Sequence, residues 1–361
     1  MSYRIFIPTA GTGSRLGKVT KYINKSLVSI ANRPVISHQI EQFPEDCEFV
    51  IALGHKGNLV KDFLELTYPK KIFHFVEVDP FEGNGSGLGL SMLACEDFLQ
   101  EPFVFLSCDT LVKESIQPPN HNWMGYSKVN DLMSYRTLDI DNERVNEICE
   151  KGVIKESLQA YIGISGIYDY KNFWQAMHEG KGLAIEKGES YGLSSIINNG
   201  VVKPYQFTWF DSGLPEKLKE AREAYRQIDE PNILEKENEA IWFIRKKVIK
   251  YSDDEKFISN RVKRSTELKG FIPEILASKK NMYYYQKAEG EVLSKSITIP
   301  LFEKLLQHSQ SFWIKERLSD ADSIKFKKSC KIFYKDKTRE RIELFYKNFN
   351  KFDGVQSING Q

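Results

Sequence analysis

The sequence feature that most constrains the fold is a glycine-rich segment near the start of the chain, Ala10–Leu16, with the sequence AGTGSRL. It follows a short apolar run, residues 3–7, which predicts the first strand of an α/β domain. The two glycines of the segment let backbone N–H groups approach an anionic ligand without a Cβ in the way. Arg15 adds a planar fork of donors for phosphate oxygens, and Lys25 adds a compact positive charge. This pattern predicts a loop that binds a polyphosphate between a strand and a helix.

Other glycine-rich motifs fit the segment less well. It is not a Walker loop, because no Gly-Lys-Ser/Thr closes it. A dinucleotide-binding fingerprint needs a third glycine three residues after Gly13, and Leu16 occupies that position. A tight structural turn is the alternative interpretation of the glycines on their own.

Apolar strands alternate with helical patterns over about the first 225 residues. Residues 49–54, 73–78 and 103–108 predict strands, and residues 59–66 and 90–98 predict helices. This alternation favours a mostly parallel sheet with helices on both faces, that is, a Rossmann-like α/β fold. Ligands of such sheets bind beyond the carboxyl ends of the strands.

Asp109 directly follows one of these apolar strands, where a carboxylate is well placed to bind Mg²⁺. An Asp that caps the next turn is the alternative. A second glycine-rich run, Gly83–Gly89, opens the predicted helix 90–98, and its glycines favour a loop that lies close to a ligand. A flexible surface loop is the alternative there.

Composition limits the class of protein. The five cysteines are scattered without metal-ligand spacing, so a reducing cytoplasm is the simplest expectation, and no apolar run is long enough to cross a membrane. Residues 241–361 carry 26 Lys and Arg against 15 Asp and Glu. Because these charges alternate along helical segments, we expect a solvated surface and no nucleic-acid partner.

The first part of the chain resembles the sugar-phosphate nucleotidyltransferases, among which the choline-phosphate cytidylyltransferases belong. The resemblance rests on Ile7–Leu16, Lys25–Ile30 and Arg33–Ile36. At one position it departs from the family pattern, because Asn24 stands where the family usually has proline. The resemblance implies a GT-A-like domain with a mixed, mostly parallel sheet over residues 1–226.

The resemblance also implies roles for individual residues. Arg15 and Lys25 would act as catalytic residues on the phosphates, and Asp109 and Asp211, the latter in Trp209–Glu216, would hold Mg²⁺. The residues implied to bind the nucleotide are Ala10, Gly11, Thr12, Gly13, Ser14, Gly85, Ser86 and Gly87.

The acceptor side is implied at Lys151, Gly166 and Glu189. A surface salt bridge is an equal explanation for Glu189 and for Glu150. Tyr161 and Tyr191 could enclose a quaternary ammonium group, which would favour phosphocholine, whereas core packing is the alternative. The nucleobase is not legible from these residues; CTP or UTP is weakly favoured, and a sugar phosphate is an equal acceptor.

The chemistry expected of such a site depends on charge. A phosphate oxygen of the acceptor attacks the α-phosphorus of the nucleotide in line, and pyrophosphate leaves. Catalysis then relies on positioning and on neutralising negative charge with Mg²⁺, Arg15 and Lys25. The six histidines show no triad or ligand spacing and are expected to be structural or on the surface.

The remainder of the chain has a different character. Residues 227–240 predict a polar linker, and residues 241–361 resemble the N-terminal part of an aminoglycoside phosphotransferase or choline kinase-like domain. A hairpin over 241–251, a helix over 255–268, an aromatic strand over 282–285 and trailing helices are expected, with Lys250 matching the lysine that binds ATP. The catalytic His-Gly-Asp loop is absent before residue 361, so we expect no phosphotransferase activity and an incomplete domain. One hypothesis is that the chain is a piece of a longer bifunctional protein.

Together these features predict an Mg²⁺-dependent, cytoplasmic nucleotidyltransferase that couples a nucleoside triphosphate to a phosphorylated small molecule for cell-surface polysaccharide synthesis. A non-catalytic nucleotide-binding regulator is one alternative. A nucleic-acid-binding protein that uses the basic C-terminal half is another. The oligomeric state is not legible from the sequence.

Overall fold

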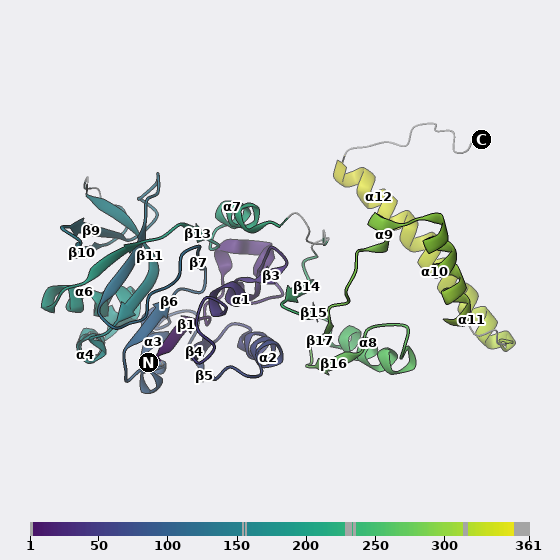
Figure 1. Ribbon diagram of the computed structural model, residues 1–361, viewed down its shortest axis with the longest axis horizontal. Helices are drawn as coiled ribbons and strands as arrows, with labels where there is room; N and C mark the ends of the chain where they lie inside the picture. The colour runs from purple at the N-terminus through teal and green to yellow at the C-terminus, as the bar shows by residue number, and fades with distance from the viewer. Residues whose placement is uncertain are drawn as a thin grey trace. The chain divides into compact units, whose positions relative to one another are not determined.

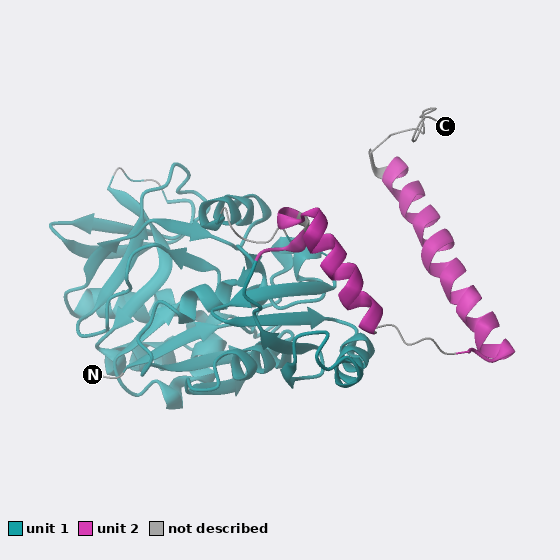
Figure 2. Cartoon of the chain, turned by 45° about the vertical axis from the view of Figure 1, so that its right-hand side comes forward, with its two compact units in different colours: residues 1–290 teal, residues 291–361 magenta. Residues whose placement is uncertain are grey.

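A computed structural model describes residues 3–153, 155, 157–227, 233, 236–312 and 317–349 of the chain. Its contacts divide the chain into two compact units, Met1–Gly290 and Glu291–Gln361, which Figure 2 shows in teal and magenta.

The first unit is built on a nine-stranded mixed sheet, whose strands lie in the purple and blue-teal part of Figure 1. In one half of the sheet, β1 pairs in parallel with β4 and β6, and β4 pairs in parallel with β5. In the other half, β11 pairs antiparallel with β6, β8 and β9. The strands are β1 (Arg4–Pro8), β4 (Glu48–Leu53), β5 (Phe73–Glu77), β6 (Phe103–Leu106), β8 (Trp123–Ser127), β9 (Thr137–Asp141), β10 (Arg144–Cys149), β11 (Leu158–Ile167) and β12 (Lys203–Gln206). The expected α/β sheet is therefore confirmed. The glycine-rich loop follows β1, which pairs in parallel with both of its neighbours, and β12 pairs in parallel with β8 in the other half.

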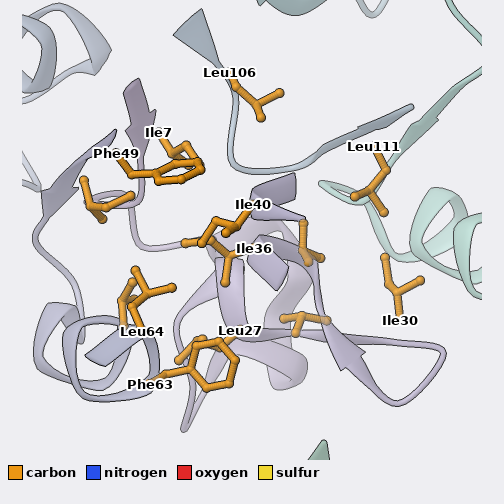
Figure 3. Packing of buried hydrophobic residues seen from close by; sticks show 14 of the residues in the cluster. Ile7, Leu27, Ile30, Ile36, Ile40, Phe49, Phe63, Leu64, Leu106 and Leu111 are labelled. Carbon is orange, nitrogen blue, oxygen red and sulfur yellow. The ribbon is translucent and has the colours of Figure 1, made fainter. Parts of the chain in front are cut away.

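Alternate side chains of the central strands supply two hydrophobic cores, one on each face of the sheet. Ile5 and Ile7 of β1 belong to one core, and Phe6 between them belongs to the other. Figure 3 shows the first core, in which Ile36 and Phe63 lie among the buried side chains. Because both faces are covered, these strands are apolar along almost their whole length.

Helices and short strands complete this part of the unit. The helices are α1 (Val35–Ile40), α2 (Gly57–Thr67), α3 (Leu88–Ala94), α4 (Tyr170–Gly180), α5 (Gly182–Lys187), α6 (Glu189–Asn199) and α7 (Pro215–Tyr225). Single 3₁₀ segments cover Ser14–Thr20, Lys25–Leu27 and Glu96–Phe98. The short strands are β2 (Ser29–Ile30), β3 (Arg33–Pro34), β7 (Thr110–Val112) and β13 (Trp209–Asp211).

The same unit also contains a small antiparallel sheet, with strand order β14-β15-β17-β16. Its elements are β14 (Glu239–Ile244), β15 (Lys247–Ser252), α8 (Glu255–Glu267), β16 (Ile275–Ser278) and β17 (Met282–Gln286). The expected hairpin, helix and aromatic strand are all present. Trp242 of β14 is completely buried and meets Phe63 of α2 edge-on, with ring centroids 5.1 Å apart.

The small sheet packs against the first part of the chain. Trp242, Ile249 and Tyr251 are part of the same core as the first strands, and the compact unit continues to Gly290. Of the predicted linker 227–240, residues 228–232, 234 and 235 lie outside the described residues. The functional division at residues 226 and 241 stays a prediction.

The second unit consists of helices. They are α9 (Leu293–Ser296), α10 (Ile299–Phe312), α11 (Asp320–Cys330) and α12 (Lys337–Phe349), with a π-helical stretch, Lys331–Asp336, between the last two. Many of its apolar side chains are exposed, among them Ile299, Ile324 and Tyr334. Within the part of the chain that the structure describes, no helix is both long and apolar enough to cross a membrane.

Candidate active site

A pocket of about 340 Å³ lies where the carboxyl ends of β1 and β6 meet. The predicted residues that line it are Ala10, Gly11, Gly13, Ser14, Arg15, Lys25, Ser86, Gly87 and Asp109. Thr12 and Gly85, also predicted to bind the nucleotide, are not among its lining residues. Both glycine-rich segments and the carboxylate after β6 therefore share one cavity.

The glycine-rich loop needs its second glycine for a steric reason. Gly13 has φ of 67°, and a Cβ there would lie 3.0 Å from the Cβ of Lys25 and 3.1 Å from Cγ2 of Thr20. The helix expected after the loop is instead a kinked 3₁₀ segment, because Gly17 inside it has φ of 56° and ψ of −118°. The structure therefore offers an anion loop amides and basic side chains at this point, and no long helix dipole.

Lys25 is held in place by the residue before it. The completely buried side chain of Asn24 donates to the carbonyls of Thr9 (3.0 Å) and His55 (2.6 Å), and its own oxygen accepts from the amide of Ser26 at 2.9 Å. These bonds join the loops after β1 and β4 to the segment that carries the lysine. The asparagine that replaces the family proline thus joins three segments of the chain, a role that its sequence position does not reveal.

Lys25 and Asp109 form an ion pair at the wall of the pocket. The Ser107 hydroxyl donates a second hydrogen bond to Asp109, at 2.6 Å. Burial alone would raise the pKa of the Asp109 carboxyl, but Lys25 and the Ser107 hydroxyl together lower it to about 2. Burial works against the charge of Lys25 as well, yet Asp109 keeps the pKa of the lysine above its ordinary value. Both groups are therefore charged at neutral pH.

Asp211 reaches the same point from a different part of the chain. β13 pairs antiparallel with β7, and this register places Asp211 opposite Thr110, next to Asp109. The amide and the hydroxyl of Ser212 both donate to the Asp109 carbonyl at 2.9 Å. Burial, and then the neighbouring charge of Asp109, raise the pKa of the Asp211 carboxyl.

Gly213 marks the point on which these charged groups converge. A Cβ at Gly213 would lie 2.7 Å from Oδ2 of Asp109, 2.9 Å from Oδ1 of Asp211 and 3.4 Å from Nζ of Lys25. The Gly213 amide donates to Asp211 Oδ1 at 2.7 Å, and the Tyr135 hydroxyl donates to its other oxygen at 3.3 Å. The structure thus brings together the two carboxylates that were predicted as metal ligands, although they are about a hundred residues apart in the sequence.

The two carboxylates at this point could supply only part of the ligands of a metal ion. Among the described residues, no cluster of three or more His, Cys, Asp or Glu side chains could enclose a metal ion. Mg²⁺ is commonly bound through one or two carboxylates, with waters and substrate phosphates as its other ligands. Asp109 and Asp211, beside a pocket lined by loop amides and the basic side chains Arg15 and Lys25, fit that pattern.

On the acceptor side, Glu189 lies at the start of α6 and is only 5% exposed. Its Oε2 atom has no hydrogen-bond partner among the described residues. Burial, opposed in part by Arg136, raises the pKa of Glu189 to about 7. The surface salt bridge considered for Glu189 is therefore wrong, whereas Glu150 does form one, with Arg136 at 3.1 Å.

The other two predicted acceptor residues, Gly166 and Lys151, do not line the pocket. Gly166 packs against the buried ring of Trp123, where a Cβ would come within 1.9 Å of the indole nitrogen. The glycine of β11 that lies beside Ser107 is instead Gly163, with φ of 71°, because the antiparallel register of β11 on β6 pairs Ile164 with Leu106 and so leaves Gly163 next to Ser107. Lys151 is exposed in the turn after β10.

Tyr161 is part of the second hydrophobic core and the partly buried Tyr191 packs against it, as the core-packing alternative expected. Lys250 of β15 pairs with Glu239 of the neighbouring strand β14 at 2.6 Å. It lines a separate pocket of about 540 Å³ that contains none of the converging residues around Gly213.

Three residues of the site besides Asn24 are not predicted from the sequence. Phe81, which is 37% exposed, lines the pocket, and Tyr135 contacts Asp211. Gly163 supports the Ser107 turn, since the Ser107 amide donates to its carbonyl at 2.8 Å. Phe81 stands beside the second glycine-rich run, which is the one signal that could have identified it.

Comparison with known proteins gives the chain a set of relatives. No family model matches it. The low-salt glycan biosynthesis nucleotidyltransferase Agl11 of Haloferax volcanii is 26% identical over 242 residues, which cover 60% of this chain and 64% of that protein. The bifunctional protein GlmU of Methanococcus maripaludis is 25% identical over 216 residues, which cover 57% of this chain and 50% of that protein. The chain thus matches between half and just under two thirds of the length of these relatives.

Solved structures show the same fold. A glucose-1-phosphate thymidylyltransferase structure from Bacillus anthracis superimposes with a TM-score of 0.54 at 23% identity, covering 65% of this chain and 98% of that one. The CTP:phosphocholine cytidylyltransferase of Streptococcus pneumoniae gives 0.50 at 16% identity, covering 62% and 99%. The homologues of this chain are nucleotidyltransferases, and its mixed α/β sheet has the fold of such enzymes.

Proposed function

We propose that this chain is an Mg²⁺-dependent nucleotidyltransferase that joins a nucleoside triphosphate to a phosphorylated small molecule and releases pyrophosphate. The observation that carries the proposal is the convergence of Lys25, Asp109 and Asp211 around Gly213, beside the pocket lined by both glycine-rich segments. The relationship to nucleotidyltransferases supports it independently.

In this mechanism the loop amides of residues 11–14 and the guanidinium of Arg15 bind the triphosphate. Asp109 and Asp211 would hold Mg²⁺, which when bound supplies positive charge to the phosphates. Lys25 neutralises charge that develops on the α-phosphate as the acceptor oxygen attacks in line and the bond to pyrophosphate breaks. The attacking phosphate is already anionic, so the step needs no general base from the protein.

The acceptor is proposed to be a sugar phosphate or a phosphocholine-like compound. Glu189 is the residue that we infer contacts it, because a buried carboxylate oxygen without a partner is suited to a ligand hydroxyl. Lys151 is exposed and Gly166 is enclosed by Trp123, so they contribute less to this proposal. A role in surface polysaccharide synthesis is supported by the glycan biosynthesis enzyme among the relatives.

For residues 241–361 we propose a resemblance to the kinase-like domain and no kinase activity. The order of the antiparallel strands β14 to β17, with α8 after β15, is compatible with it. Lys250 is paired with Glu239 of the neighbouring strand β14. We propose that this part transfers no phosphate.

The experiment that tests the function is a screen for pyrophosphate release. It crosses ATP, GTP, CTP, UTP and dTTP with a panel of sugar 1-phosphates and phosphocholine, in the presence of Mg²⁺. We expect turnover with at least one pair, and its loss in Asp109→Ala with the fold intact. Glu186→Gln, an exposed carboxylate on α5, is the matched control and should retain activity.

Two results would point to the alternatives. Nucleotide binding without pyrophosphate release from any pair would favour a non-catalytic regulator. Salt-sensitive binding to oligonucleotides, with no response to triphosphates, would favour a nucleic-acid-binding protein. Normal Mg²⁺-dependent turnover by Asp109→Ala would show that the assigned metal site is wrong.

A further inference from the structure

Three consecutive backbone carbonyls just before Lys25 are held by side chains from distant parts of the chain. Lys56, at the start of α2, donates to the carbonyl of Thr20 at 2.9 Å and to that of Lys21. The hydroxyl of Tyr251, on β15, donates to the carbonyl of Tyr22. The segment that leads to Lys25 is therefore fixed from outside itself, and one of its anchors comes from the small sheet.

Tyr251 is itself rigidly placed. It is 1% exposed, and its ring stacks on that of Trp242, with centroids 5.9 Å apart and an interplanar angle of 23°. Trp242 in turn packs against Phe63 of α2. The hydroxyl of Tyr251 thus projects from a packed aromatic group that cannot easily move.

The small sheet also holds the segment on the far side of Lys25. The indole N–H of Trp242 donates to the Ser29 hydroxyl at 2.9 Å, and the amide of Phe243 donates to the Asn32 carbonyl at 2.9 Å. β14 and β15 therefore contact the chain both before and after Lys25. Between these contacts, the amides of Leu27 and Val28 close the short 3₁₀ turn that begins at the lysine.

The position of the Lys25 ammonium group depends on the position of its backbone, because the side chain is enclosed. Its ammonium group pairs with Asp109, and its side chain is 13% exposed. Charge stabilisation of a transition state depends on preorganised groups, and a displacement of about 1 Å can reduce a rate by as much as ~100-fold. A shift of the Tyr22–Lys25 backbone would move the lysine relative to both Asp109 and the α-phosphate.

We propose that Tyr251 is a positioning residue for nucleotidyl transfer, which acts through the Tyr22 carbonyl to fix Lys25 opposite Asp109. The small sheet then contributes to nucleotidyl transfer, because it carries a residue that positions Lys25. The inference rests on the proposed function for its effect on turnover, whereas the tether itself can be measured without any substrate.

The test compares wild type with Tyr251→Phe, which keeps the ring against Trp242 and removes only the hydroxyl. Tyr283→Phe is the matched control, because its hydroxyl lies in the same small sheet and donates to none of the residues that the structure describes. Backbone hydrogen exchange is measured over residues 22–30 in the ligand-free full chain, with residues 49–66 as an internal reference. Thermal unfolding shows whether each variant is folded.

We expect faster exchange at the amides of residues 26–28 in Tyr251→Phe, with the reference segment and the control unchanged. With the substrate pair found in the screen, kcat should fall about tenfold, while KM for the nucleotide changes by less than about twofold. Unchanged exchange at residues 26–28 would overturn the tether, and a wild-type kcat in Tyr251→Phe would overturn the positioning role. If wild type turns over no substrate pair, the proposed function fails, and the exchange result still decides whether the tether exists.

Discussion

Replacing Glu189 by glutamine should make the protein more stable at neutral and alkaline pH. Glu189 is a buried carboxylate whose Oε2 has no hydrogen-bond partner among the described residues, and burial raises its pKa from an ordinary 4.5 to about 7. Glutamine has nearly the same shape and carries no charge at any pH. The substitution therefore removes the cost of ionising a buried group and leaves the packing of α6 in place.

The sign and size of the effect follow from proton linkage. Because the folded-state pKa lies above the unfolded one, folding is favoured most below pH 4.5, and this contribution is lost as the pH rises through about 7. One pKa unit corresponds to about 1.4 kcal/mol, so the wild type should lose about 3 kcal/mol relative to Glu189→Gln between pH 4.5 and 8.

The assay is urea unfolding of both proteins at several pH values between 4.5 and 8, without ligands. The difference in the free energy of unfolding between the variant and wild type should grow with pH. Glu186→Gln, three residues earlier and exposed on α5, should show no such growth. A difference that stays constant across this range would refute the interpretation of Glu189 as a buried, ionisable carboxylate without a partner.

Three further predictions concern the pocket. Gly213→Ala should lower kcat at least about tenfold and leave the thermal unfolding temperature nearly unchanged. The added methyl group would lie 2.7 Å from Asp109 Oδ2 and displace the two carboxylates. An unaltered kcat would show that Asp109 and Asp211 do not meet beside Gly213. Phe81→Ala should weaken nucleotide binding about tenfold in calorimetry, because an aromatic ring that lines the pocket can stack on a base. Phe81→Trp should bind the nucleotide nearly as well as wild type. Equal affinities in all three proteins would exclude that contact. A chelator should abolish pyrophosphate release, and added Mg²⁺ should restore it. The unfolding temperature of the ligand-free protein should not change, because Asp109 is paired with Lys25 when no metal is bound. Turnover that persists in the chelator would refute the metal requirement.

The sequence was sufficient to predict the sheet and the meeting of the main charged residues. The apolar runs before Ala10 and Asp109 identify strands, and the ends of parallel strands lie along one edge, so the glycine-rich loop and Asp109 had to be near each other. The place of Asp211 depended on the family resemblance, because the pairing of β13 with β7 leaves no periodic signal in so short a strand.

Long-range contacts were not predictable in the same way. The register of β11 on β6 decides that Gly163 and not Gly166 lies beside Ser107, and no local pattern distinguishes the two glycines. In the sequence, Asn24 is only a departure from the family proline, whereas in the structure its amide group donates to the carbonyls of Thr9 and His55. Burial of Trp242 against Phe63 likewise involves residues far apart in the chain, so no local pattern could show that the two segments pack together.

The packing of Trp242 on α2 has a practical consequence for anyone who wishes to express part of this protein. A fragment cut after α7 would end at the apparent limit of the transferase-like sequence, yet it would uncover the ring of Phe63 and leave the Tyr22 carbonyl without its donor. Such a fragment should be prone to aggregation and poor in activity even if every pocket residue is present. The smallest useful piece for crystallisation or assay therefore runs to Gly290.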